Sequence, residues 1–184
     1  MKKICLVGCG SIGRLHAKNL VDKAELCFYS RTRASAQAFS GEFGGGRVFD
    51  SYEEVLDSAV DAVLISTPPE AHRVQVIDAI EAGKGVLVEK PLCATAEDLV
   101  AIGAVAAAHP DVLLMVAENY YYKPALKLIK WVLQQDLIGE VRQATIGKRF
   151  TQASSGWKSG YGALLEGGVH FVAFGADLFD GELR

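Results

Sequence analysis

A glycine-rich turn directly after the first apolar run is the feature that most constrains the fold of this chain. The run Lys3-Ile4-Cys5-Leu6-Val7 leads into Gly8-Cys9-Gly10-Ser11-Ile12-Gly13, and a helical pattern covers residues 12–21. In such a motif the first glycine permits a tight strand-to-helix turn, the second lets the backbone approach a pyrophosphate, and the third lets the helix pack against the strand. The helix N-terminus adds partial positive charge. This context predicts a dinucleotide site at Gly8, Gly10, Ser11, Ile12 and Gly13 rather than a turn without a ligand.

Short apolar runs alternate with helical patterns as far as residue 118. We expect strands at residues 4–7, 25–29, 48–49, 61–65, 86–88 and 112–116. We expect helices at residues 12–21, 34–39 and 69–83, and two more that begin at the capping residues Ser51 and Thr95. Such alternation pairs the strands in parallel, because each helix returns the chain to the start of the next strand. The pattern predicts an α/β fold with a doubly wound parallel sheet, a Rossmann domain over residues 1–118.

The pattern changes over residues 119–184. A helix is expected over residues 123–135, an exposed antiparallel strand over 140–151, a loop over 152–162 and a helix over 163–179. One strand and one helix cannot enclose a core, because their apolar faces need more sheet. We therefore expect the beginning of an α+β second domain, which is either truncated or completed by another subunit.

Composition narrows the classes of partner. The 184 residues carry a net charge of −3, without the basic surface that nucleic-acid binding requires, and no apolar segment approaches membrane-spanning length. The four cysteines form no CxxC pair, which favours reduced thiols and a cytoplasmic protein. No third ligand accompanies the histidines at a suggestive spacing, so no metal site is predicted.

Lys90 follows a predicted buried strand, within Glu89-Lys90-Pro91. Ligands of open α/β sheets bind at the carboxyl ends of the strands, where a lysine can donate to a substrate oxygen or move a proton. Pro91 raises the question of a cis peptide bond beside this lysine. The alternative for Lys90 is an ion pair at the protein surface.

Glu166 and His170 are four residues apart on a predicted helix and so lie on one face. A histidine beside a carboxylate suits general-base chemistry, since the carboxylate orients the ring and stabilises its protonated form. The alternative is an ordinary core histidine. The other three histidines, for which no comparable partner is evident, are interpreted as structural: His16, His72 and His109.

Ser30-Arg31-Thr32-Arg33 follows the second predicted strand, where NAD-selective sites place an acid against the ribose 2′-hydroxyl. A small hydroxyl followed by arginine suits a 2′-phosphate instead, because guanidinium pairs with phosphate through two hydrogen bonds. Ser30, Arg31 and Thr32 therefore favour NADP over NAD as cofactor. The alternative is that the arginines only solvate the next helix.

Several segments in order resemble the Gfo/Idh/MocA family, named for glucose–fructose oxidoreductase, inositol dehydrogenase and rhizopine catabolism. The segments are Val7–Ala17, Ser66-Thr67-Pro68-Pro69-Glu70-Ala71-His72, Glu89-Lys90-Pro91-Leu92, Glu118-Asn119-Tyr120, Ile138-Gly139-Glu140-Val141 and Gly167-Gly168-Val169-His170. The resemblance implies hydride transfer between a nicotinamide and a small sugar, inositol or related carbinol, in a homo-oligomer. A binding module without catalysis, acting as a sensor or scaffold, is the alternative.

The resemblance also assigns roles to residues. It makes Lys90, Glu166 and His170 catalytic, with the histidine accepting the hydroxyl proton and the lysine polarising the oxygen. It adds Thr67, Pro68, His72, Glu89, Lys90 and Asn119 to the cofactor site. Lys90, His170, Trp157 and Lys158 are the implied substrate contacts. Two positions depart from the usual pattern: Glu166 stands where many members have Asp, and Ala173 where a second Asp often follows.

Overall fold

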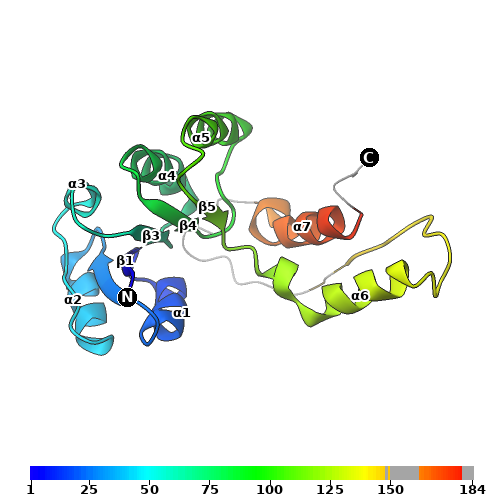
Figure 1. The fold of residues 1–184 in the computed structure, drawn as a ribbon, viewed down its shortest axis with the longest axis horizontal. Coiled ribbons are helices and arrows are strands. Elements are labelled where there is room, and N and C mark those ends of the chain that lie inside the picture. The colour runs from blue at the N-terminus through cyan, green and yellow to red at the C-terminus, as the bar shows by residue number, and fades with distance from the viewer. Residues whose placement is uncertain (148, 150–161, 180–184) are drawn as a thin grey trace. The chain divides into compact units, whose positions relative to one another are not determined.

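The computed structural model describes residues 1–147, 149 and 162–179 (Figure 1). The chain divides into two compact units, Met1–Ala117 and Glu118–Arg184. Over the described residues, no helix combines the length and the apolar character needed to cross a membrane.

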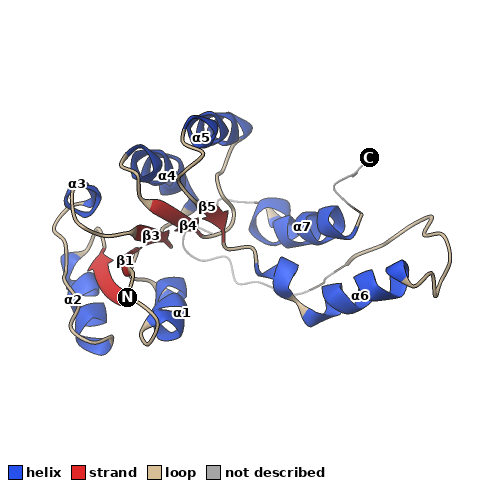
Figure 2. Cartoon of the chain, in the orientation of Figure 1, coloured by secondary structure: helices blue, strands red, loops and turns tan. Residues whose placement is uncertain are grey.

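The first unit is built on a five-stranded parallel sheet (Figure 2). Its strands are β1 (Lys3–Val7), β2 (Glu25–Tyr29), β3 (Ala62–Ile65), β4 (Gly85–Val88) and β5 (Leu114–Val116), in the order β2-β1-β3-β4-β5. The predicted doubly wound parallel sheet is confirmed. The chain runs outward from β1 to β2 and then crosses back to β3, so the strand order reverses between β1 and β3. A crevice for ligands forms at the carboxyl ends of the strands at such a point.

The strand predicted at residues 48–49 is reduced to a single bridge. Val48 pairs in parallel with Phe28, while Phe28 N donates to Arg47 O at 2.9 Å and Phe49 N donates to Phe28 O at 3.0 Å. The segment follows three glycines and is only two residues long, too short for a repeating ladder. It nevertheless adds one parallel bridge beside β2.

Helices cover both faces of this sheet. They are α1 (Ser11–Leu20), α2 (Arg33–Glu42), α3 (Tyr52–Leu56), the 3₁₀ turn η1 (Pro69–Ala71), α4 (His72–Glu81) and α5 (Ala96–Ala108). Both predicted N-caps are confirmed. The Ser51 hydroxyl accepts from Glu54 N at 3.1 Å, and the Thr95 hydroxyl accepts from Asp98 N at 3.1 Å. Such caps satisfy amide groups that the helix itself leaves unpaired, and each is worth about 1 kcal/mol.

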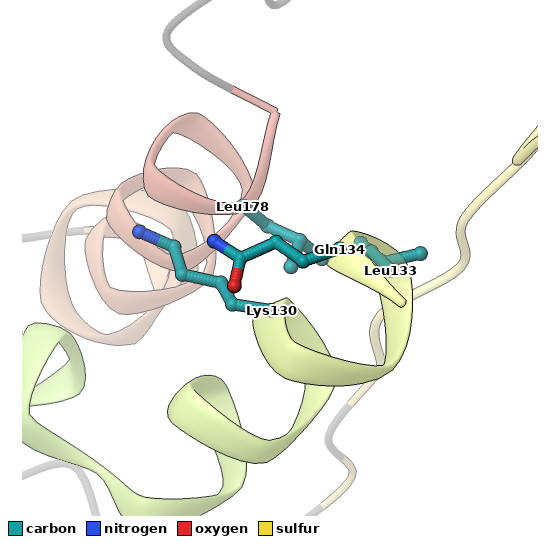
Figure 3. A pocket seen from close by; sticks show the side chains of 4 residues that line it. All are labelled: Lys130, Leu133, Gln134 and Leu178. Carbon is teal, nitrogen blue, oxygen red and sulfur yellow. The ribbon is translucent and has the colours of Figure 1, made fainter. Parts of the chain in front are cut away.

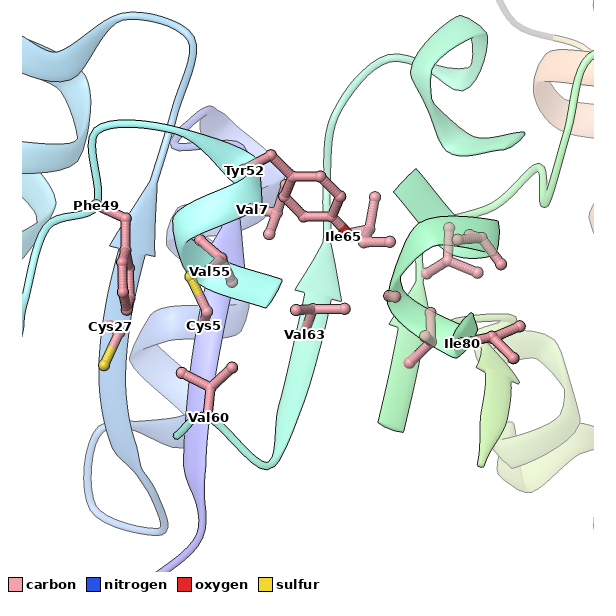
Figure 4. Packing of buried hydrophobic residues seen from close by; sticks show 14 of the residues in the cluster. Cys5, Val7, Cys27, Phe49, Tyr52, Val55, Val60, Val63, Ile65 and Ile80 are labelled. Carbon is pink, nitrogen blue, oxygen red and sulfur yellow. The ribbon is translucent and has the colours of Figure 1, made fainter. Parts of the chain in front are cut away.

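Two apolar cores form because side chains alternate between the faces of each strand. Cys5, Val7, Val63 and Ile65 pack with residues of α3, α4 and α5 (Figure 4), while Leu6 packs on the opposite face with residues of α1 and α2. The strands read as nearly continuous apolar runs, as expected for a sheet buried on both faces. This arrangement leaves the loops at the strand ends as the place for polar groups with a function.

The second unit contains the turn η2 (Asn119–Tyr122), α6 (Pro124–Gln134), a π-helical segment η4 (Leu164–Gly168) and α7 (Val169–Leu178). Lys130 of α6 and Asp177 of α7 form an ion pair at 2.8 Å. Beside this pair lies a small open pocket, lined by Lys130, Leu133, Gln134 and Leu178 (Figure 3).

Residues 140–147 form no strand, contrary to the prediction of a strand over residues 140–151. A strand needs a neighbour to pair its backbone groups, and no described segment of this unit supplies one. The remaining residues of that prediction fall almost entirely outside the described part of the chain. The predicted loop over residues 152–162 does too, except for Gly162.

Candidate functional site

The turn between β1 and α1 has the geometry of a phosphate-binding loop. Gly8 has a φ of 101°, and a Cβ there would lie 2.9 Å from Ser66 C and Thr67 N. A Cβ at Gly13 would lie 2.3 Å from Gly8 O, whereas a Cβ at Gly10 would meet nothing within 4 Å. The first and third glycines are thus required by the packing of the protein, and the second borders open space. That open space lets a phosphate come close to the backbone of the loop.

The N-terminus of α1 supports the same reading. Gly10 is its N-cap residue, no side chain caps this end, and the first turn contains no acidic residue. Ser11 and Ile12 are exposed. The helix end therefore keeps its partial positive charge and its N–H donors for an anion, and these residues fit the pyrophosphate of a dinucleotide.

Ser66 ties this loop to the neighbouring strand. Its hydroxyl lies 2.7 Å from Gly8 O and donates to it. The next residue, Thr67, donates from its hydroxyl to Gln75 Oε1 at 2.6 Å, and Pro68 is exposed. Ser66 was not among the predicted site residues, since a serine at a strand end gives no signal of its partner.

The segment after β2 contains two arginines, Arg31 and Arg33, whose surroundings differ. Arg33 forms an ion pair with Asp50. Arg14, which belongs to α1, forms an ion pair with Glu42. Arg31 is exposed, and none of the ion pairs among the described residues involves it. Of the two arginines in this segment, the predicted residue Arg31 is therefore the one that has no ion pair with the described residues.

The segment after β4 is held by a histidine of α1. Glu89 Oε1 lies 2.7 Å from His16 Nε2, and Glu89 Oε2 accepts from Lys90 N at 3.2 Å. The peptide bond between Lys90 and Pro91 is cis. His16 was expected to lack a comparable partner, and this expectation was wrong. The partner is distant in sequence.

His72 is buried, with 1% of its surface exposed. Its Nδ1 lies 2.9 Å from Pro91 O and its Nε2 lies 2.8 Å from Thr67 O. Both ring nitrogens are therefore engaged by backbone carbonyls. This agrees with a structural role and gives no support to a direct contact between His72 and a cofactor.

In the second unit, His170 is paired with Glu118. Its Nδ1 lies 2.7 Å from Oε1 and 2.8 Å from Oε2 of Glu118, a residue that is 5% exposed. Glu118 Oε1 also accepts from Tyr120 N at 2.9 Å. Sequence spacing had instead selected Glu166 as the carboxylate that orients this histidine. The backbone of Glu166 lies in η4, and Glu118 takes the position on Nδ1.

Aromatic contacts fix the plane of the His170 ring. The ring stacks on Tyr120 with centroids 4.5 Å apart and an angle of 13° between the planes. Lys123 Nζ lies 3.5 Å from the centroid of Tyr120, and Phe171 and Phe174 meet the same tyrosine edge-on. No described residue forms a hydrogen bond with Nε2 of His170. A ring with one nitrogen on a buried carboxylate and the other left over is suited to exchanging a proton.

Asn119, Trp157 and Lys158 complete the set of predicted site residues. Asn119 is exposed at the start of η2. Trp157 and Lys158 lie outside the described residues. Within the described part of the chain, no three His, Cys, Asp or Glu side chains gather as metal ligands would.

Comparison with known proteins agrees with the dinucleotide-binding fold described above. Residues 2–118 match the family model described as "Oxidoreductase family, NAD-binding Rossmann fold" (GFO_IDH_MocA). The chain is 32% identical over 148 residues to an inositol 2-dehydrogenase of Rhizobium meliloti (78% of this chain, 44% of the relative). It is 27% identical over 195 residues to a glucose-6-phosphate 3-dehydrogenase of Bacillus subtilis (99% and 55%).

Among solved structures, scyllo-inositol dehydrogenase from Lactobacillus casei with bound NAD(H) and scyllo-inositol is similar, with a TM-score of 0.71 and 28% identity. That match covers 76% of this chain and 43% of the other. The chain thus spans about half the length of the relatives that it matches.

Proposed function

Since this chain belongs to the Gfo/Idh/MocA oxidoreductase family with its NAD-binding Rossmann fold, we propose that it serves hydride transfer between NADP(H) and a sugar or polyol. The observation that carries this proposal is His170, held through Nδ1 by the buried carboxylate of Glu118, while no described residue forms a hydrogen bond with Nε2. Relatives named as dehydrogenases of inositol and glucose 6-phosphate support the substrate class.

The proposed chemistry divides between a few side chains. When bound, the nicotinamide supplies a hydride acceptor or donor. During oxidation His170 Nε2 accepts the hydroxyl proton of the substrate, and Glu118 stabilises the imidazolium that results. Lys90 donates a hydrogen bond to the same oxygen as negative charge develops on it. Glu166 remains a candidate for the substrate side of the site, since Glu118 already occupies Nδ1.

The cofactor is proposed to bind along the carboxyl ends of β1, β2 and β3. The amides of Ser11, Ile12 and Gly13 at the start of α1 would hold the pyrophosphate, and Gly10 offers the open approach. Arg31, with Ser30 and Thr32 beside it, would hold the 2′-phosphate of NADP. Thr67, Pro68, Glu89 and Asn119 are proposed to line the nicotinamide side. Trp157 and Lys158 are proposed to meet the substrate.

A calorimetric titration with NADPH and with NADH is the first test, followed by turnover with a panel of inositols and hexoses. Replacement of Lys90 by methionine keeps the length of the side chain but removes its donor. We expect Lys90→Met to lower kcat about a hundredfold or more while the dissociation constant for the cofactor changes little. Equal turnover would refute the role of Lys90. Cofactor binding with no turnover on any substrate of the panel would favour the non-catalytic sensor or scaffold.

We also propose that the protein self-associates. Leu128 and Trp131, three residues apart on α6, expose 61% and 52% of their surfaces, and exposed apolar residues on one side of a helix favour association. Light scattering at high micromolar concentration tests this, and a stable monomer would refute it.

A further inference from the structure

The loop that carries Lys90 is anchored on both sides by histidines. The residue before it, Glu89, pairs with His16 of α1 at 2.7 Å. The carbonyl of the residue after it, Pro91, lies 2.9 Å from His72 Nδ1 at the start of α4. The lysine proposed for catalysis is therefore fixed between a helix that borders the phosphate loop and a helix that follows β3.

His72 holds a second loop at the same time. Its Nε2 lies 2.8 Å from Thr67 O, in the loop after β3 that also packs against Gly8 of the phosphate turn. One imidazole ring thus connects the loops that follow β3 and β4. With 1% of the residue exposed, the ring is shielded from bulk solvent.

The chemistry of the two partners determines the state of the ring. A backbone carbonyl oxygen only accepts hydrogen bonds, so each ring nitrogen must donate. A neutral imidazole has one N–H group and one lone pair, and it would place that lone pair against a carbonyl oxygen at a buried position. Only the imidazolium has two N–H groups.

We propose that His72 is a buried imidazolium whose two N–H groups clamp the Thr67 and Pro91 carbonyls, and that it is a positioning residue for Lys90. The inference about the ring rests on contacts within the first unit alone. Its consequence for turnover rests on the proposed function. His72 itself touches neither substrate nor cofactor in this role.

The state of the ring is measured on the unaltered protein. The chain has four histidines, so spectra of the variants His16→Gln, His109→Gln and His170→Gln assign the imidazole signals of His72 by elimination, without changing His72. In ¹H–¹⁵N spectra recorded at neutral pH, we expect both ring nitrogens of His72 to show the shifts of N–H groups, with two ring protons that exchange slowly. One unprotonated nitrogen would overturn the imidazolium. This measurement stands whether or not the proposed reaction is observed.

The positioning role is measured with His72→Gln, using His109→Gln as the matched control. A glutamine amide at position 72 cannot span both carbonyls. We expect the amide signals of Thr67 and Lys90 to move in His72→Gln and to stay in place in His109→Gln. We expect kcat to fall about tenfold to a hundredfold in His72→Gln with KM nearly unchanged. A displaced Lys90 would stabilise the transition state less well, while the binding of the substrate would change little. Unchanged Lys90 signals in a folded His72→Gln protein would refute the clamp, and a KM effect without a kcat effect would refute the positioning role.

Discussion

Replacement of Arg31 by alanine tests the proposed cofactor preference on a single charge. Arg31 is exposed and forms no ion pair with the described residues, whereas Arg33 is paired with Asp50. A guanidinium that meets a phosphate makes charge-assisted hydrogen bonds worth about 1.5–3 kcal/mol when water is excluded. At an exposed position we discount this to about 1–2 kcal/mol, which corresponds to roughly a fivefold to thirtyfold loss of affinity.

The assay is isothermal titration calorimetry of the wild-type chain, Arg31→Ala and Arg33→Ala, each with NADPH and NADH. Arg31→Ala is expected to weaken NADPH by the factor above and to leave NADH within about twofold. Arg33→Ala is the matched control. It frees the carboxylate of Asp50, and at ordinary ionic strength that exposed charge is expected to change NADPH affinity by less than about threefold.

Raising the salt concentration adds an internal check, because an exposed charge pair is screened while the hydrogen bonds of the phosphate loop are much less so. The difference between NADPH and NADH should therefore shrink as salt rises. Equal losses for both cofactors in Arg31→Ala, or no loss for NADPH, would refute the reasoning. A larger effect from Arg33 than from Arg31 would show that the ion pair with Asp50 opens when cofactor binds.

Three further predictions concern the rest of the site. Glu118→Gln keeps the shape of the side chain but removes the negative charge that lies beside His170 Nδ1. We therefore expect kcat to fall about tenfold to a hundredfold, with cofactor affinity unchanged. A larger loss of kcat in Glu166→Gln would return the orienting role to Glu166. Gly13→Ala should destabilise the protein in thermal unfolding, because its Cβ would lie 2.3 Å from Gly8 O. Gly10→Ala, where a Cβ meets nothing, should keep its stability and lose cofactor affinity, and the opposite order would contradict the assignment of the turn. Burial raises the pKa of Cys9 to about 12, so at pH 8 only about one thiol in ten thousand is ionised; labelling with iodoacetamide, followed by mass spectrometry, should be slow at pH 8 and accelerate steadily up to pH 10, and rapid labelling at pH 8 would refute the burial.

The fold could be predicted because its signals are local. The glycine turn, the alternation of strand and helix, and the caps at Ser51 and Thr95 each depend on residues within a few positions of one another. The strand expected over residues 140–151 failed for the opposite reason. Alternating polarity describes only one side of a strand, and no described segment of that unit pairs with residues 140–147.

The partners within the site could not be predicted in the same way. His16 and Glu89 are 73 residues apart, and Glu118 and His170 are 52 apart. Spacing along one helix proposed Glu166 for His170, because positions four residues apart are the pairs that a sequence displays. A carboxylate at the start of η2 becomes a candidate only once the fold brings the two segments together. The segment Glu118-Asn119-Tyr120 was identified as part of a family pattern, but nothing in the sequence indicated that the Glu118 carboxylate pairs with His170.

Both apolar cores consist of residues from the first unit, from Ile4 to Val116. The nucleotide-binding half therefore has its own source of stability, and changes in the second half leave that source intact. A substitution in the segment that bears His170 is therefore expected to leave the packing of these two cores unchanged. The stability of the Rossmann unit and variation in the segment that bears His170 are thereby separable properties of one chain.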